Sequence, residues 1–274
     1  MRYLGVSREE IFSPNRVEGD AAVFHAVVAE LERQGNEVLC MTGQELVRQG
    51  IPDGIDGIFQ MARSREVLAV LENATVPVTN SARAVKNCGR ARQTEILKDS
   101  GLIPESLVCS TRRVPDVWGS YPCWIKRGDS HSMEPGDVLF LRDEADCNAA
   151  MVDFAVRGID TCVLQNHVSG WVAKFYGIRG AGITDCYAVS LKESKFGQER
   201  YNEQPDSSGV SMETLTAMAE RASRMLELDV FGGDAVVGPD GEITLIDFND
   251  WPSFRTCTVE AARKISELII GRTG

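Results

Sequence analysis

The chain has 274 residues, of which 43% are hydrophobic and 25% are charged, and its formal net charge at pH 7 is −11. This apolar content argues against disorder and is enough for a substantial core, divided into two or three compact lobes. The acidic balance argues against non-specific binding to nucleic acid, which depends on basic surface, and favours a small ligand.

Cysteine usage and hydropathy indicate the cellular setting. The eight cysteines are scattered without a C-x-x-C pair, which favours reduced thiols over a zinc cage or a disulfide framework. No segment is long and apolar enough to span a bilayer, and the N-terminus enters a strand without a charged-then-apolar leader. We therefore expect a soluble cytoplasmic protein with no membrane or nucleic-acid partner. Exposed helices on its first lobe could support a homodimer.

The first 87 residues alternate apolar strands with helical segments, which is typical of an open, mostly parallel α/β sheet. Strands are expected at 2–6, 37–41, 57–61 and 76–80, and helices at 20–31, 43–49 and 64–72. No G-x-G-x-x-G motif follows the first strand, so a dinucleotide role has weak support. Ligands of such sheets bind beyond the carboxyl ends of the strands, which makes Ser7, Arg8, Arg63 and Arg65 candidate substrate contacts.

The middle of the chain contains a strand that ends in a lysine. After a helix expected over 81–100, strands are predicted at 107–109, 121–126 and 138–141. Lys126 ends the second of these and leads into the polar loop 127–137, which can hold a cation and free N–H groups over nucleotide phosphates. A surface hairpin would have a similar sequence. His131 in this loop is open to two interpretations, a phosphate contact or a solvated side chain.

A second lysine, Lys174, lies on a largely apolar strand expected over 170–177. Such a lysine must reach water or meet an anion, and the presence of Lys126 favours an anion. The remaining elements expected are a helix over 143–157, a strand over 161–168 and helices over 211–226 and 258–270.

A hairpin lies between the last two of these helices, with apolar strands on either side of a Pro-Asp-Gly turn at 239–241. If its strands pair, Asp234, near the start of one, lies at the same end of the sheet as Asp247 and Asn249, near the end of the other. Three hard oxygen donors suit Mg²⁺. Acids at strand ends also serve as turn formers and helix caps, but the two upstream lysines favour a metal site.

These residues, in this order, resemble the ATP-grasp superfamily, and within it the branch of RimK-like ligases and inositol trisphosphate 5/6-kinases. The likeness covers most of the chain from about Asn80 to Phe254. Its markers are Asn80-Ser81 before a helix, Lys126 on a strand, the segment 163–168 as a hinge, Lys174 in Ala-Lys-Phe-Tyr, Arg200-x-Asn202, Phe-Gly-Gly-Asp at 231–234 and Ile-Asp-Phe-Asn-Asp-Trp-Pro at 246–252.

The resemblance implies an α/β fold in which an N-terminal open parallel α/β lobe, 1–87, precedes a two-subdomain ATP-grasp fold. The small subdomain would cover 88–166 and the C-terminal subdomain 167–274. ATP would lie between two lobes with Mg²⁺ or Mn²⁺. The resemblance assigns Gln165, Asn166, His167 and Val168 to the adenine, and Arg90, Lys126, Lys174 and Asn202 to further nucleotide contacts. It places Arg200 near the γ-phosphate and makes Arg200 and Lys174 the catalytic residues. The metal would be held by Asp234, Asp247 and Asn249.

The implied chemistry is attack of a carboxylate on the γ-phosphate to give an acyl phosphate, which an amine or thiol displaces with release of ADP and phosphate. The substrate would be a small molecule or a peptide, contacted by Arg63, Arg255 and His131. Arg90 stands where many relatives have lysine, and arginine keeps the charge in a planar fork. Asp247 stands where ligases often have glutamate and the kinase branch also has aspartate. A small-molecule kinase of the same fold and a non-catalytic ATP-binding regulator are therefore the alternatives.

Overall fold

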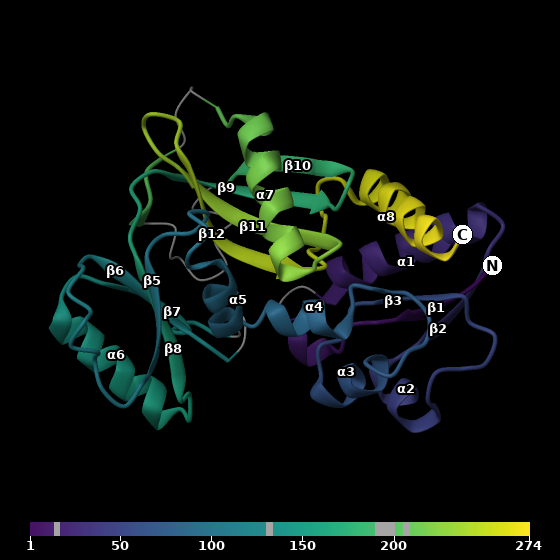
Figure 1. Ribbon diagram of the computed structural model, residues 1–274, viewed down its shortest axis with the longest axis horizontal. Coiled ribbons are helices and arrows are strands. Elements are labelled where there is room, and N and C mark those ends of the chain that lie inside the picture. The colour runs from purple at the N-terminus through teal and green to yellow at the C-terminus, as the bar shows by residue number, and fades with distance from the viewer. Residues whose placement is uncertain (14–16, 130–133, 190–200, 205–208) are drawn as a thin grey trace.

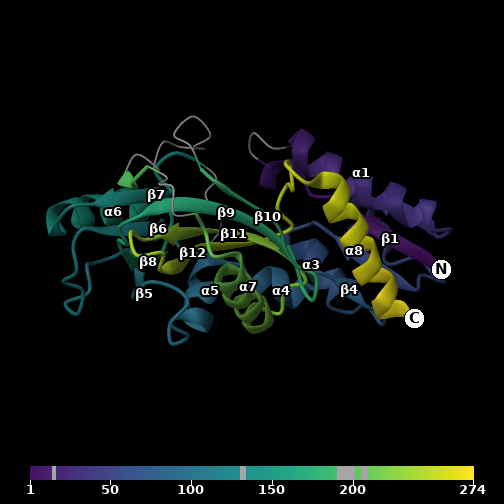
Figure 2. The same ribbon diagram turned by 90° about the horizontal axis from the view of Figure 1, so that it is seen from above.

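The computed structural model describes residues 1–13, 17–129, 134–189, 201–204 and 209–274. Its strands form three four-stranded sheets, which we number in chain order. The third sheet lies between the other two in space, as both views show (Figures 1 and 2). This mixed architecture confirms the predicted α/β class.

The first sheet is parallel, as predicted, and has the order β2-β1-β3-β4. Its strands are β1 (Arg2–Val6), β2 (Glu37–Met41), β3 (Gly57–Gln60) and β4 (Val78–Thr79). The helices of this lobe are α1 (Val17–Arg33), α2 (Gly43–Gln49) and α3 (Arg65–Leu71), with a short 3₁₀ turn η1 (Glu10–Phe12). Thr42 begins α2 with a capping box, because its side chain and that of Glu45 bond each other's main-chain N–H groups.

The second sheet is antiparallel and has the order β5-β8-β6-β7. Its strands are β5 (Ser106–Ser110), β6 (Cys123–Arg127), β7 (Val138–Leu141) and β8 (Thr161–Asn166). Helix α6 (Glu144–Val156) covers one face, where Phe154 packs against Ile125 and Leu164. Because side chains alternate along a strand, Lys126 lies on the opposite face.

The third sheet is antiparallel and has the order β10-β9-β11-β12. Its strands are β9 (Trp171–Ile178), β10 (Gly182–Ala188), β11 (Val230–Val237) and β12 (Ile243–Asp250). Helix α7 (Met212–Leu226) packs on one face through Leu215, Ala219 and Ala222. Strand β10 is absent from the sequence prediction, although the β-branched and aromatic residues of Ile183 to Tyr187 could have indicated it.

The helix predicted over 81–100 is instead two helices, α4 (Ala82–Asn87) and α5 (Arg90–Leu97). Gly89 between them has φ −55° and ψ 128°, which is not a helical conformation, and glycine is a poor helix former. Because of this break, Arg90 is the first residue of α5.

The C-terminal helix α8 (Thr258–Thr273) returns to the first lobe, so the two chain ends lie on the same side of the molecule (Figure 1). It packs on α1, with Ile265 and Ile269 in the same core as Val27 and Leu31. The domain boundaries predicted after residues 87 and 166 remain a prediction. They assign α8 to the C-terminal subdomain, although this helix packs on the first lobe. Among the helices of the described residues, none has the length and apolarity needed to cross a membrane.

Asn80 joins the first lobe to the third sheet. Its side chain is completely buried, and its Oδ1 accepts hydrogen bonds from the main-chain N–H groups of Asp229 and Val230 at 2.7 and 2.9 Å. Its Nδ2 donates to the carbonyl oxygen of Val230 at 2.7 Å. The amide side chain therefore bonds the start of β11 as a neighbouring strand would.

We expect Asn80→Ala to lower the free energy of unfolding by about 3 kcal/mol, because each buried group left without a partner costs about 1–3 kcal/mol. Urea denaturation measures this change. Asn73→Ala is the matched control, since it removes one exposed hydrogen bond to the carbonyl oxygen of Ala69 and should cost less than about 0.5 kcal/mol. Equal losses in the two variants would contradict the role of Asn80.

Candidate functional site

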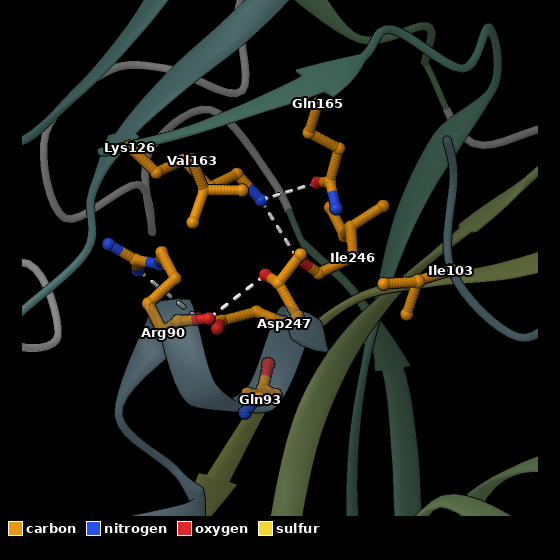
Figure 3. A pocket seen from close by; sticks show the side chains of 9 residues that line it. Arg90, Gln93, Ile103, Lys126, Val163, Gln165, Ile246 and Asp247 are labelled. Carbon is orange, nitrogen blue, oxygen red and sulfur yellow. Dashed lines mark hydrogen bonds and ion pairs between the residues drawn. The ribbon is translucent and has the colours of Figure 1, made fainter. Parts of the chain in front are cut away.

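A pocket lies where the second and third sheets meet helix α5 (Figure 3). The residues that line it are Arg90, Gln93, Thr94, Ile103, Lys126, Val163, Gln165, Ile246 and Asp247. The pocket thus brings together four residues that the sequence assigned to a nucleotide or metal site, namely Arg90, Lys126, Gln165 and Asp247.

Lys126 extends across the pocket from one sheet to the other (Figure 3). Its Nζ donates to Gln165 Oε1 on β8 at 2.7 Å and to the carbonyl oxygen of Ile246 on β12 at 2.8 Å. Burial, with a further contribution from the Arg90 guanidinium, lowers the pKa of Lys126 to about 8, although nearby carboxylates act in the opposite direction. An anion in the pocket would therefore stabilise the charged form of this lysine.

Arg90 and Asp247 approach each other on another side of the pocket. The Arg90 guanidinium lies 3.9 Å from Asp247 Oδ2 and 3.4 Å from the carbonyl oxygen of Arg127. Gln93, one helical turn after Arg90, donates to the carbonyl oxygen of Phe248 at 2.6 Å. These contacts hold the polar face of α5 against β12.

A row of four side chains crosses the third sheet beside the pocket. The strand register aligns Asp247 with Asp234, Asp234 with Lys174, and Lys174 with Tyr187. Directly opposed residues share one face of a sheet, so all four lie on the same face. Lys174 Nζ is 2.5 Å from Asp234 Oδ1. Burial acts to lower the pKa of Lys174, but the Asp234 carboxylate outweighs it and raises that pKa.

Asp234, Asp247 and Asn249, the residues of the predicted metal site, lie on one face of the third sheet. Asn249 follows Asp247 by two positions and therefore lies on the same face, with its Nδ2 3.3 Å from Asp247 Oδ2. Two carboxylates and an amide oxygen fit a hard cation such as Mg²⁺. In the described part of the chain, no group of three or more His, Cys, Asp or Glu side chains could hold a metal ion.

The arrangement of the hairpin differs in one respect from the expectation. Asp234 lies in the middle of β11 and not near its start, so the donors meet on a sheet face instead of a sheet end. A register shift beside Asp234 leaves Ile246 as an extra residue in β12. Such a bulge redirects nearby groups, and the carbonyl oxygen of Ile246 is the one that accepts from Lys126.

The predicted adenine segment, Gln165 to Val168, is bonded to its surroundings. Gln165 Nε2 donates to Ser106 Oγ at 3.0 Å, while the main-chain N–H groups of Asn166 and His167 donate to carbonyl oxygens of neighbouring loops. Trp124 Nε1 donates to His167 Nδ1 at 3.2 Å, and burial lowers the pKa of His167. This segment consists of the last two residues of β8 and the two residues after it, and it reaches the pocket through Gln165.

The other predicted residues do not line the pocket or lie outside the described residues. Asn202 is partly buried within the short segment 201–204. Arg200 and His131 fall outside the described residues. Each of them therefore keeps the role that the sequence predicts, as a prediction.

The two candidate substrate arginines each have partners within the protein. Arg63 Nη2 is 2.7 Å from Asp250 Oδ1. Arg255 donates from Nε to Tyr187 Oη at 3.3 Å, and its guanidinium lies 5.5 Å from the centre of that ring. Tyr187 Oη in turn is 2.9 Å from Tyr176 Oη. Arg255 is therefore connected, through Tyr187, to the row that contains Lys174.

The remaining pocket residues were not assigned to the site from the sequence, although Val163 and Ile246 belong to segments that carry the resemblance. The unassigned residues are Gln93, Thr94, Ile103, Val163 and Ile246. Gln93 and Thr94 lie three and four positions after Arg90, so helical spacing could have placed them on one face with it. For the apolar residues no signal separates a pocket wall from ordinary core.

No protein-family model and no curated protein matches the sequence. Solved structures match over nearly the whole chain. A D-alanine–D-alanine ligase from Bacillus anthracis complexed with ATP has a TM-score of 0.71 and 14% identity, covering 100% of this chain and 97% of its own. A RimK domain protein ATP-grasp from Sphaerobacter thermophilus has a TM-score of 0.66 and 17% identity, covering 99% and 100%. The ATP-grasp ligase PsnB, complexed with minimal precursor, has a TM-score of 0.64 and 19% identity, covering 98% of both chains.

The low pKa of Lys126 predicts a specific dependence of stability on pH. Between about pH 8 and the ordinary lysine value of 10.5, the unfolded chain holds a proton that the folded chain has released, so the free energy of unfolding rises with pH. The shift corresponds to about 3 kcal/mol. We expect the unfolding free energy of the natural chain, relative to Lys126→Met, to rise by up to this amount across the window.

Urea denaturation at a series of pH values tests this expectation. Lys174→Met is the control, because the pKa of Lys174 is raised and that lysine stays charged across the same window. A difference between the natural chain and Lys126→Met that does not change with pH would show that Lys126 titrates normally.

Proposed function

We propose that this chain, which has the ATP-grasp fold, is an ATP-dependent ligase. It would activate a carboxylate as an acyl phosphate and join it to an amine or a thiol on a small molecule or peptide, releasing ADP and phosphate. The observation that carries the proposal is the convergence of two cations and a carboxylate on one pocket between two sheets, beside a second lysine that is paired with a carboxylate.

Phosphoryl transfer requires little covalent work by the protein, but it requires positioned charges. Lys126 and Arg90 supply two cations at the pocket, and both side chains are almost completely buried. In a site with little water, such charges act strongly on phosphate oxygens. We assign Lys126 and Arg90 to the phosphates of the nucleotide, with Gln165 orienting Lys126 and the segment 165–168 beside the adenine.

Acidic groups of the site are paired with its cations. Lys174 lies at Asp234, and Arg90 lies near Asp247. Asp234, Asp247 and Asn249 would hold Mg²⁺ or Mn²⁺, which would supply positive charge to the phosphates of the nucleotide. On binding, each carboxylate would exchange its cationic side chain for the metal, while Lys174 and Arg90 would turn to phosphate oxygens. Every charge would then keep an opposite partner.

The proposed reaction has two steps. A carboxylate oxygen of the substrate attacks the γ-phosphorus. The bond between the γ-phosphorus and the oxygen that bridges the β- and γ-phosphates breaks, which releases ADP. The amine or thiol then attacks the acyl carbon, loses its proton, and expels phosphate. Lys174 would stabilise the transferred phosphoryl group, together with the predicted Arg200, and Asn202 would be a further nucleotide contact.

The substrate side of the site is assigned to the surface that faces the first lobe. Tyr176, two positions beyond Lys174 on β9, packs in the core shared by the first lobe and α8. The charged row therefore lies between the nucleotide pocket and that lobe. Arg255 is a candidate for a carboxylate of the substrate, because it is joined to this row through Tyr187. Arg63 and His131 are the other candidates.

An assay of products tests the reaction class. Protein, Mg-ATP and pools of amino acids or metabolites are incubated, and ADP, free phosphate and product masses are measured. We expect ADP with stoichiometric phosphate and a condensed product. ADP with a phosphorylated product and no free phosphate would instead identify a kinase. Tight ATP binding with no ADP from any pool would identify a regulator.

A charge-neutral substitution tests the metal site. We expect Asp247→Asn to lower kcat/KM for ATP by about a hundredfold or more, because one anionic metal ligand is lost and each tenfold corresponds to about 1.4 kcal/mol. Asp240→Asn is the matched control, since Asp240 is exposed in the turn of the same hairpin and its loss should leave the rate unchanged. Retained activity in a folded Asp247→Asn protein would refute the metal assignment.

A further inference from the structure

Two cysteines face each other across neighbouring strands of the second sheet. The register of β5 and β8 pairs Cys109 directly with Cys162, and their Sγ atoms are 3.5 Å apart. These residues are 53 positions apart in sequence, so only the strand pairing brings them together. All eight cysteines of the chain are free thiols in the structure.

The backbone brings this pair within reach of a disulfide. Main-chain hydrogen bonds from Thr111 to Asp160 and from Asn166 to Glu105 identify Cys109 and Cys162 as a hydrogen-bonded antiparallel pair. Such pairs have Cα atoms about 5.5 Å apart, which is within the range that disulfides span. Closing the bond shortens the Sγ–Sγ distance from 3.5 Å to about 2.0 Å. This requires side-chain rotation and a small local approach of the two strands, because the Cβ atoms of a hydrogen-bonded pair lie farther apart than those of a disulfide.

The two thiols differ in access. Cys109 is half-buried on β5, which is an edge strand of the sheet, whereas Cys162 is completely buried on the strand beside it. When Cys162 donates its hydrogen bond, it stabilises the thiolate of Cys109 and lowers the pKa of that thiol, against the effect of burial. An accessible thiol with lowered pKa beside a second thiol is typical of a cysteine that is oxidised and then resolved.

The other thiols of the same core lack this combination. Cys123 on β6 and Cys147 on α6 are completely buried, and burial raises the pKa of both, to about 11 for Cys123. Cys40 is exposed on β2, in the first lobe. These three thiols provide internal comparisons for the pair.

We propose that Cys109 and Cys162 form an oxidation site that closes to an intramolecular disulfide when the protein meets a peroxide. The Cys109 thiolate attacks one peroxide oxygen, which yields a sulfenic acid and releases water after proton transfer. The sulfur of Cys162 then attacks the sulfur of Cys109 and a second water leaves. In sum, two thiols lose two electrons and two protons, and one hydrogen peroxide is reduced to two waters.

The disulfide would form on the face of the sheet that packs under α6. Gln165 and Ser106, which belong to the same two strands, lie on the opposite face with Lys126. Oxidation should therefore leave the pocket intact and fasten the edge strand β5 to the sheet. This inference does not depend on the proposed ligase activity.

The test uses the full chain, treated with a small excess of hydrogen peroxide, alkylated under denaturing conditions and digested for mass spectrometry. We expect a linked peptide that joins Cys109 to Cys162, lost on treatment with dithiothreitol. We also expect Cys147→Ser to retain the link, because Cys147 belongs to the same core but not to the pair. A link that joins Cys109 to Cys147 or Cys123 instead would overturn the proposal.

A second variant separates failure to oxidise from failure to resolve. In Cys162→Ser, the sulfenic acid of Cys109 has no partner, so labelling of Cys109 by dimedone should rise at least tenfold over the natural chain. Equal labelling in the two proteins, or oxidation of Cys40 with none at Cys109, would also overturn the proposal. Circular dichroism establishes that each variant is folded.

Discussion

The carboxylate of Asp250 is almost completely buried, and two arginines of the first lobe hold it. Arg63 lies 2.7 Å away and Arg8 3.6 Å away, and both also bond main-chain carbonyl oxygens at the end of β12. A buried carboxylate without such partners would cost several kcal/mol. Because β12 also carries Asp247 and Asn249, this ion-paired junction determines where the residues of the proposed metal site lie relative to the first lobe. Arg63 therefore has a structural partner in addition to its candidate role toward substrate.

Charge is distributed unevenly across the site. Lys174 is matched by the carboxylate of Asp234, whereas Lys126 is bonded by two neutral oxygens and lies close to another cation. The pocket therefore has more positive than negative side-chain charge, whereas in the row on the third sheet the charge of Lys174 is matched by that of Asp234. A nucleoside triphosphate with a divalent cation would complement both parts of the site, since the phosphates would contact Lys126 and the metal would contact Asp234 and Asp247.

Local patterns predicted most elements but missed two features that control the site. Strand β10, which supplies Tyr187, was missed because its alternation is interrupted by polar residues and a bulge. The break at Gly89 was missed because the surrounding residues continue a helical pattern. That break makes Arg90 the first residue of α5, beside the pocket. At Gly89, contacts of α5 with distant strands outweigh the local helical preference of the sequence.

The sequence by itself determined the parallel first lobe, the two strand lysines and the acidic hairpin, because these follow from side-chain period and turn residues within short windows. Only the tertiary structure decided that Asp234 pairs with Lys174, that Gln165 bonds Lys126, and that α8 returns to α1. Those contacts join residues that are far apart in the chain. Their geometry depends on strand register and on the packing of three sheets, which no local pattern encodes.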